Sequence, residues 1–278
     1  MTEPTTTGPG AASVLEQVLG DLEAESAALA ARLVPLADDA GGWRRPTPAP
    51  GWDVATQVGH LTWTDDVAAL AARAAAGDAA AWDAVVTDAL GDPDGFVDAA
   101  ALAAGDRPAT EVLARWETAR ADLAAALRAL PGGTRMPWFG PPMSATSMAT
   151  ARFMETWTHA HDVREALGAA PEPTDRIRHV AHLGVRTRGF AFAAHGRPVP
   201  EAEVRVELVA PSGARWTWGP EDAEQRVTGP AYDFCLRVTQ RRPRSALALV
   251  ATGDVAEAWL DVAQCFAGPP GAGSGARA

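Results

Sequence analysis

Four polar residues near the middle of the chain, Arg152, Glu155, His159 and Asp162, are spaced three, four and three positions apart. On an α-helix this spacing places all four side chains on one face, because residues three and four apart are neighbours there. A glutamate and a histidine one turn apart can both bind a single metal ion. The segment therefore predicts a helix that presents metal-ligating groups on one face.

A third ligand must come from elsewhere in the chain, and His60 is the candidate. Two histidines and a glutamate leave a coordination position open for water or substrate, as in catalytic zinc sites. The alternative is an exposed row of ion pairs, each contributing about 0.3–0.5 kcal/mol. The flanking residues Phe153, Met154 and Trp157 are large and apolar, which favours a helix buried in a bundle. Ionisable groups in such a core need a compensating partner such as a metal ion.

The other two residues of this face suit supporting roles. Asp162, one turn beyond His159, can orient a ligand histidine as an outer carboxylate. Arg152 can hold Glu155 or bind an anionic group of a substrate. His161 lies about 200° around the helix from His159 and so is not expected to share the same ion.

The composition argues against several classes of function. The 278 residues include 24 basic and 35 acidic side chains, a net charge of −11. Nucleic acids and anionic membrane surfaces both attract basic patches, so neither is an expected partner. We find no signal peptide and no apolar run of the ~20 residues that a membrane helix needs, and we expect a cytoplasmic protein. The two cysteines, Cys235 and Cys265, lie in apolar segments and are expected to be buried thiols.

Helical patterns dominate the first part of the chain. Leu15, Leu22, Leu29 and Leu36 repeat every seven residues, which predicts a long helix of a bundle. Further helices are predicted over 54–75, capped by Asp53, and over 110–130. Residues 77–106 form an irregular excursion with one or two short helices. The helix with the polar face begins at Ser144 or Ser147 and ends at Gly168, which completes a four-helix bundle with a site in its core.

The pattern changes after residue 170. We predict a helix over 175–194, strands over 204–208, 214–218 and 246–250, and helices over 234–238 and 255–266. The prediction is therefore an α+β protein: a tail over 1–11, a four-helix domain over 12–170, a small α+β domain over 171–267 and a tail over 268–278. The tails are rich in Gly, Pro, Ser and Ala, which is typical of disorder.

Three segments together resemble a known family. Residues 51–61 (GWDVATQVGHL), 137–143 (PWFGPPM) and 151–162 (ARFMETWTHAHD) resemble the DinB-like superfamily, and most closely the mycothiol-dependent maleylpyruvate isomerases and their actinobacterial relatives. The resemblance covers essentially the whole chain. It implies a four-helix metal-binding domain, followed over residues 200–266 by a small sterol-carrier-like α/β domain. It also implies a divalent metal, usually zinc, bound by His60, Glu155 and His159.

The isomerases of this family also use an arginine of the C-terminal domain near the active site. Arg241 is the matching position here, with Arg242 or Arg237 as alternatives. The assignment matters because isomerisation of a dicarboxylate needs a cation beside the metal.

The leading functional hypothesis is a metal-dependent enzyme that uses a small thiol, of the mycothiol type, for isomerisation or S-transfer on a small electrophile. Three tryptophans are candidates for the pocket wall: Trp63, Trp138 and Trp157. One alternative is a metal-dependent hydrolase or lyase with an activated water and no thiol. Another is a non-enzymatic protein that binds small molecules. Either a monomer or a homodimer is compatible with the sequence.

Overall fold

The computed structural model describes residues 11–268, and within them the chain divides into two compact units that meet at Pro171 and Glu172. The first unit is helical and the second contains a mixed sheet, so the α+β prediction is confirmed. The predicted tails lie outside the described residues, except for Ala11 and Gly268. None of the described helices is long and apolar enough to cross a membrane.

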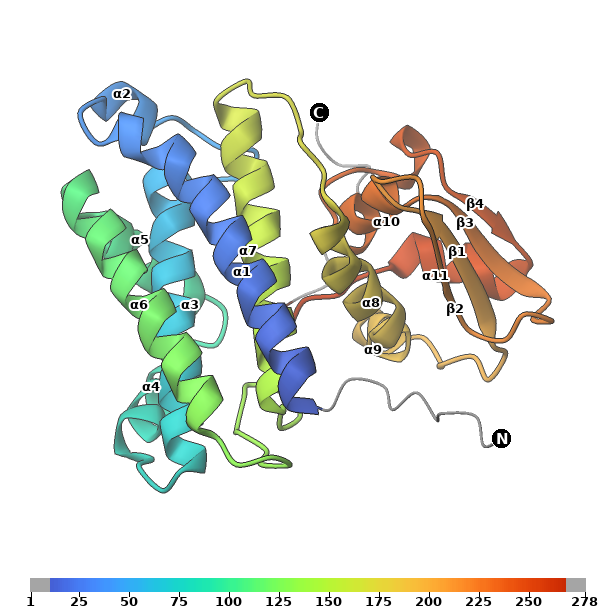
Figure 1. Cartoon of the computed structure of the whole chain (residues 1–278), viewed down its shortest axis with the longest axis horizontal. Coiled ribbons are helices and arrows are strands. Elements are labelled where there is room, and N and C mark those ends of the chain that lie inside the picture. The colour runs from blue at the N-terminus through green and yellow to red at the C-terminus, as the bar shows by residue number, and fades with distance from the viewer. Residues whose placement is uncertain (1–10, 269–278) are drawn as a thin grey trace, which may run out of the picture. The chain divides into compact units, whose positions relative to one another are not determined.

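The N-terminal unit is a helical bundle. Its elements are α1 (Ala11–Leu33), η1 (Val34–Leu36), α2 (Ala40–Trp43), α3 (Val54–Ala75), α4 (Ala80–Gly91), α5 (Phe96–Gly105), α6 (Ala109–Ala129) and α7 (Ala145–Ala166). Helices α1, α3, α6 and α7 run side by side (Figure 1), and α3 packs against α5, α6 and α7. The four predicted long helices are confirmed, as are two short helices in the excursion.

Side-chain caps fix where α3 and α7 begin, the two helices that carry the candidate metal ligands. The Asp53 carboxylate accepts hydrogen bonds from the backbone amide and the hydroxyl of Thr56, both at 2.8 Å, and so begins α3. The Ser144 hydroxyl accepts from the amide of Ser147 at 3.1 Å and begins α7. Gly168, with a φ of 65°, follows the end of α7 in the left-handed conformation that glycine adopts without strain.

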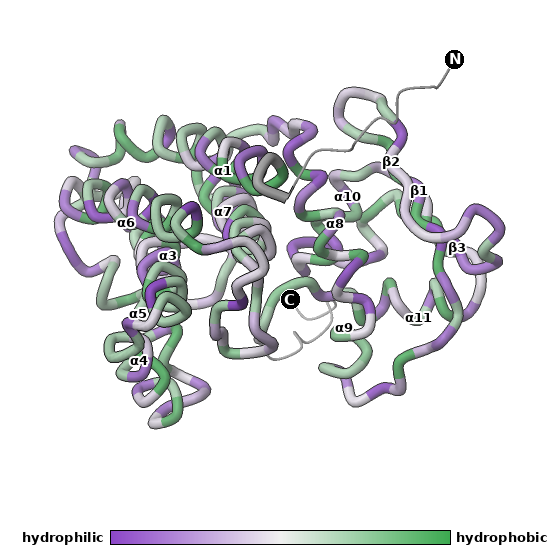
Figure 2. Tube along the Cα trace, turned by 60° about the horizontal axis from the view of Figure 1, so that its bottom comes forward, coloured by the Kyte–Doolittle hydropathy of each residue, from purple (hydrophilic) through white to green (hydrophobic). Residues whose placement is uncertain are grey.

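Two apolar layers enclose a polar one in the bundle. One layer includes Val58 and Leu61 of α3, and the other includes Ala68 and Ala72 further along the same helix. Between them α3 contributes Thr64 and Asp65, both buried. Figure 2 shows hydrophilic and hydrophobic stretches alternating along the helices of this unit. The bundle therefore places charged groups at mid-height, between its two cores.

The C-terminal unit has two layers. Its elements are η2 (Asp175–Ile177), α8 (Arg178–Arg186), α9 (Arg188–Ala194), β1 (Val204–Val209), β2 (Arg215–Trp218), β3 (Gln225–Pro230), α10 (Ala231–Val238), η3 (Arg244–Ala246), β4 (Val250–Thr252) and α11 (Asp254–Val262). The strand order is β2-β1-β3-β4, with β1 and β3 parallel and the outer pairs antiparallel.

Alternation along the strands explains how the sheet is covered. Val206, Leu208 and Val227 are fully buried, and α10 and α11 pack against these strands. Between the buried positions, Glu207 forms ion pairs with Arg205 and with the side chains of Arg215 and Arg226. Cys235 of α10 and Cys265 after α11 are both buried thiols, as predicted, and form no disulfide among the described residues.

The structure of this unit differs from the prediction in four places. The helix over 175–194 is divided, because Thr187 ends α8 and begins α9. The strand over 246–250 is absent: η3 ends at Ala246, β4 begins at Val250, and the Ala248 amide between them donates to the Asp233 carboxylate at 2.7 Å. The strand β3 was missed, since its sequence QRVTGP contains a single large apolar residue. The last helix also ends at Val262, short of the predicted residue 266.

A close approach of α3 and α5 fixes the helix that carries His60. A Cβ atom on Gly59 would lie 2.4 Å from the Ala101 carbonyl oxygen, and one on Gly105 would lie 2.7 Å from the Ala55 carbonyl oxygen. Backbone atoms cannot yield as a flexible side chain can. The two glycines therefore allow a contact that no larger residue permits.

We expect Gly59→Ala to lower the free energy of unfolding by about 1–3 kcal/mol, the cost of overpacking a tight contact. Gly20→Ala is the matched control, because Gly20 lies on the exposed side of α1 with no atom within 4 Å of the added Cβ. That variant should gain about 0.5–1 kcal/mol from helix propensity. Urea unfolding of both measures the difference, and equal effects would contradict the close contact.

Candidate metal centre

The structure brings His60 of α3 together with Glu155 and His159 of α7. His60 Nε2 lies 3.3 Å from Glu155 Oε2, and His159 Nε2 lies 3.2 Å from the same oxygen. One ligand atom from each residue falls within 4.8 Å of the other two. Two ligands bound about 2.1 Å from one ion at tetrahedral positions lie about 3.4 Å apart, so these separations fit a shared metal ion.

The three side chains differ in exposure. The side chains of His60 and His159 are each 9% exposed, whereas that of Glu155 is 22% exposed. The imidazoles are therefore buried in the bundle, and the carboxylate marks the more accessible side of the cluster. Among the described residues, no fourth His, Cys, Asp or Glu joins this group.

A chain of hydrogen bonds fixes the orientation of His159. The Thr47 hydroxyl donates to the Trp52 carbonyl at 2.9 Å, so its lone pairs remain to accept a bond from the amide NH₂ of Gln57 at 2.8 Å. The other atom of that amide, Gln57 Oε1, then faces His159 Nδ1 and accepts a hydrogen bond from its N–H. The lone pair of His159 therefore lies on Nε2, the atom that faces Glu155.

This arrangement needs a cation. A lone pair on His159 Nε2 opposite a carboxylate oxygen is repulsive unless a proton or a metal ion lies between them. His60 presents its Nε2 to the same oxygen, while its Nδ1 is buried and has no hydrogen-bond partner among the described residues. The donor set, with two imidazole nitrogens and one carboxylate oxygen, suits zinc and similar divalent ions.

Glu155 is held in its ionised form. Burial raises the pKa of its carboxyl, but when the two imidazoles are protonated their hydrogen bonds and positive charges outweigh burial, and a bound metal cation would act in the same direction. The net effect places the pKa of Glu155 well below its ordinary range. The carboxylate is thus available as an anionic ligand at neutral pH.

Aromatic rings surround the cluster. Trp52 stacks on His159 with ring centroids 5.8 Å apart, and its ring lies 5.1 Å from that of His60. Trp63 lies 6.4 Å from His60 on the other side. From Trp63 a strip of ring contacts continues through Phe96, Phe139, Trp138 and Trp82. Of the three predicted wall residues, Trp63 touches a ligand ring, Trp138 lies further along the strip, and Trp157 is buried against His161.

Arg152, predicted to hold Glu155 or to bind an anionic group of a substrate, forms its observed side-chain bonds with α3. Its Nε donates to Asp65 Oδ1 at 2.9 Å and its Nη2 to the Thr64 hydroxyl at 2.5 Å. Arg152 is 2% exposed and therefore lies in the polar layer between the two cores. It couples α7 to α3, so it positions the helices that carry the ligands.

Asp65 carries the counter-charge. Burial raises the pKa of its carboxyl, and the charges of Arg152 and Arg120 oppose that rise. A buried ion pair of this kind costs desolvation energy, and removal of one partner leaves the other charge uncompensated. The sequence contains no local signal for this pair, because the two residues are 87 positions apart.

The remaining predicted residues lie elsewhere. Asp162 is buried on α7, and its role as an outer carboxylate stays a prediction; the bond seen at His159 Nδ1 goes to Gln57. Gln57 was missed, although it lies three positions before His60 on the same helical face. In the C-terminal unit, Arg237 donates to the carbonyls of Leu260 and Asp261, and Arg241 Nη1 donates to the Thr239 carbonyl at 2.9 Å. Arg241 as the substrate-binding cation stays a prediction.

Comparison with known proteins identifies the class to which this bundle and its cluster belong. A family model described as the mycothiol maleylpyruvate isomerase N-terminal domain matches residues 22–164, more than half of the chain. The chain belongs to this family. A second model, described as wyosine base formation, matches residues 200–252.

Particular relatives extend the match over nearly the whole chain. An uncharacterized protein of Mycobacterium tuberculosis, found in strains CDC 1551 / Oshkosh and ATCC 25618 / H37Rv, is 51% identical over 255 residues, which cover 92% of this chain and 97% of that protein. The crystal structure of the mycothiol-dependent maleylpyruvate isomerase has a TM-score of 0.52 at 16% identity and covers 80% of this chain and 88% of its own. A histidine-to-alanine mutant of it gives 0.54 at 15% identity, with 85% and 92% covered. These structures show a shared fold.

We expect Gln57→Leu to weaken zinc binding by about 10–100-fold, because His159 Nδ1 loses the acceptor that sets its tautomer. Gln57→Glu keeps an acceptor at this position and should bind within a few-fold of the wild type. Competition with a chromophoric chelator at constant pH measures both affinities. Unchanged affinity in Gln57→Leu would contradict the role of this bond.

Asp65→Asn should lower the free energy of unfolding by about 3–5 kcal/mol, since it leaves the Arg152 guanidinium buried without a counter-charge. The double variant Asp65→Leu with Arg152→Met removes both charges and should recover most of that loss. Asp66→Asn is the neighbouring control: its pair with Arg115 is half exposed, and its loss should cost at most about 1 kcal/mol. Denaturant unfolding distinguishes these cases, and equal losses for Asp65→Asn and Asp66→Asn would argue against a buried pair.

Proposed function

We propose that this chain is a divalent-metal-dependent enzyme that uses a low-molecular-weight thiol, of the mycothiol type, for isomerisation or S-transfer on a small electrophilic substrate. The observation that carries the proposal is the convergence of His60, Glu155 and His159 with three ligand atoms and no fourth protein ligand among the described residues. Membership of the isomerase family supports the choice of a thiol. We further propose zinc as the metal.

The residues in and beside the cluster would have distinct roles. His60 and His159 offer neutral imidazole nitrogens and Glu155 offers one negative charge, so a divalent ion in the cluster keeps a net positive charge. Bound zinc supplies a position at which a thiol loses its proton readily near neutral pH. Gln57 holds His159 in the tautomer that this requires.

The surroundings favour a small, partly apolar substrate. Trp52 and Trp63 present aromatic faces next to the ligand rings, where they exclude water and pack against the substrate. A thiolate generated beside these rings can add to an electrophilic carbon. The addition opens a C=C double bond and leaves an enolate. Rotation about the resulting single bond and expulsion of the thiolate give cis–trans isomerisation, whereas protonation of the enolate carbon by solvent keeps the new C–S bond and gives S-transfer.

An anionic substrate would need a cation. Within the N-terminal unit, Arg152 is committed to Asp65, and Arg44 pairs with Asp53 and Asp106. We therefore propose that Arg241 of the C-terminal unit binds an anionic group of the substrate, with Arg242 as the alternative. The solved relative is named a maleylpyruvate isomerase.

The test uses full-length, zinc-loaded protein with mycothiol and maleylpyruvate or a related unsaturated acid. Glu155→Gln should lower the rate of isomerisation or thiol consumption at least about 100-fold, because the cluster loses its charged ligand. Glu117→Gln, on the exposed face of α6, is the control and should retain wild-type activity. Absorbance of the acid and titration of free thiol report the two reactions.

Two results would contradict this proposal. A metal-free Glu155→Gln variant with wild-type activity would remove the metal from the reaction. Activity that is metal-dependent but independent of added thiol would instead indicate a hydrolase or lyase with an activated water.

A further inference from the structure

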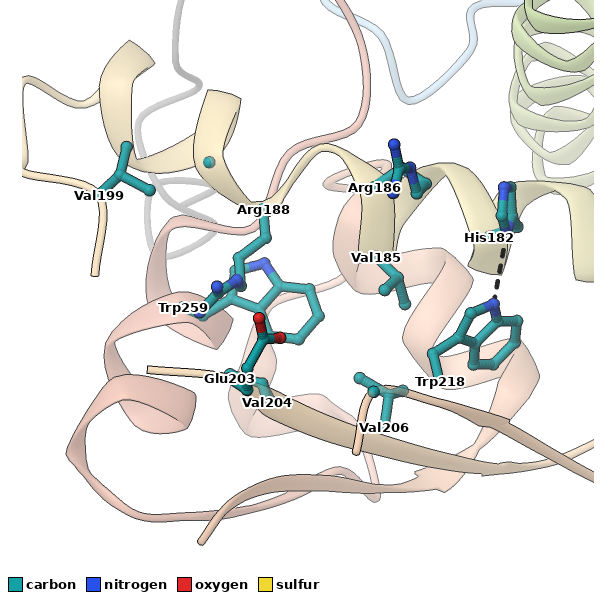
Figure 3. A pocket seen from close by; sticks show the side chains of 12 residues that line it. His182, Val185, Arg186, Arg188, Val199, Glu203, Val204, Val206, Trp218 and Trp259 are labelled. Atoms are coloured by element: carbon teal, nitrogen blue, oxygen red, sulfur yellow. Dashed lines mark hydrogen bonds between the residues drawn. The ribbon is translucent and has the colours of Figure 1, made fainter. Parts of the chain in front are cut away.

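The C-terminal unit contains a concave site of its own, formed by none of the candidate metal ligands. Helices α8 and α9, the strands β1 and β2 and the helix α11 line a pocket of about 480 Å³ (Figure 3). Pockets of this volume hold small organic ligands. All of its lining residues belong to the C-terminal unit, so the pocket is complete within one compact body.

One buried polar group in the pocket wall has no partner. Trp259 is 1% exposed, and its indole N–H makes no hydrogen bond among the described residues. Buried polar groups in native proteins are nearly always paired, and an orphan next to a cavity indicates a missing acceptor. Figure 3 shows the indole of Trp259 on the same side of the pocket as Arg188 and Glu203. The ligand should therefore carry a hydrogen-bond acceptor.

Cationic groups dominate the rest of the polar lining. Arg188 Nη1 donates a hydrogen bond to the Ala202 carbonyl at 2.8 Å, and the other N–H groups of its guanidinium remain available to a ligand. Arg186 has no ion-pair or hydrogen-bond partner within residues 11–268, and Glu203 is the single acidic residue of the lining. This excess of positive charge contrasts with the net charge of −11 of the whole chain.

The pKa of His182 is lowered by burial and by nearby positive charges. Its Nδ1 accepts a hydrogen bond from the Trp218 indole N–H at 3.3 Å, which requires the neutral ring. Burial lowers the pKa of His182, and the positive charges of Arg186, His179 and Arg178 lower it further. The positive potential at this site therefore comes from several residues of α8.

Apolar surface completes the pocket. Val185, Val204 and Val206 line it together with the rings of Trp218 and Trp259, and Val199 at its edge is 52% exposed. An ion with no apolar body would leave this surface in contact with water. A ligand that carries a negative group on an apolar body satisfies both parts of the lining.

We propose that this pocket binds a small organic carboxylate with an aromatic or aliphatic body. The carboxylate accepts hydrogen bonds from the Trp259 N–H and the arginines, and the body packs against Trp218 and the valines. The proposal does not rest on the proposed thiol chemistry, since none of the lining residues belongs to the metal cluster.

Isothermal titration of full-length protein with 1-naphthaleneacetate tests this directly, and its uncharged amide is the comparison ligand. Arg186→Gln should weaken binding of the acid about tenfold, and Glu203→Gln should strengthen it several-fold, because the two changes move the local charge in opposite directions. Arg215→Gln, on an exposed strand position outside the pocket, is the control and should have no effect. Decanoate in place of the aromatic acid tests the aliphatic class.

Each titration is repeated with zinc-loaded and chelator-treated protein, since a carboxylate can also bind a metal. Binding that survives removal of the metal, favours the acid over the amide and responds to the two pocket variants in opposite directions supports the proposal. Binding that disappears with the metal and ignores Arg186→Gln would place the ligand at the metal cluster and overturn it. No binding of either acid, or equal binding of acid and amide, would also overturn it.

Discussion

The hydrogen bond between Gln57 and His159 decides which imidazole nitrogen faces Glu155, and the chemistry of the bundle depends on that choice. Thr47 and the Trp52 carbonyl fix the orientation of the Gln57 amide. A chain of three hydrogen bonds therefore sets the tautomer of His159. A buried carboxylate opposite a lone pair is stable only with a cation between them. The fold therefore imposes an electrostatic arrangement that favours a metal cation at this position.

The rest of the bundle serves to hold α3 and α7 in register. The Arg152–Asp65 pair connects the two helices between the apolar cores, Asp53 and Ser144 fix where they begin, and Gly59 allows α5 to approach α3. Each of these contacts lies outside the cluster. A ligand set built from two helices is only as well placed as the contacts that fix their relative positions.

Local patterns made part of this structure predictable. The spacing of Glu155 and His159, the cap at Asp53 and the heptad of leucines all follow from helical geometry within one segment. Contacts between distant segments were not predictable in this way: Arg152 was assigned to Glu155 because Asp65 is remote in the sequence. The strand β3 was missed because its burial depends on its neighbours in the sheet. The segment 246–250 was predicted as a strand from its apolar run, which does not reveal that the Ala248 amide donates a hydrogen bond to the Asp233 carboxylate.

The central claim is that three side chains from two helices hold one divalent metal ion with a position left open. Elemental mass spectrometry of untagged protein, with His159→Ala prepared in parallel, tests it most directly. The account predicts about one metal ion per chain in the wild type and none in the variant. No metal in the wild type after zinc reconstitution and washing, or equal metal in both proteins, would contradict it.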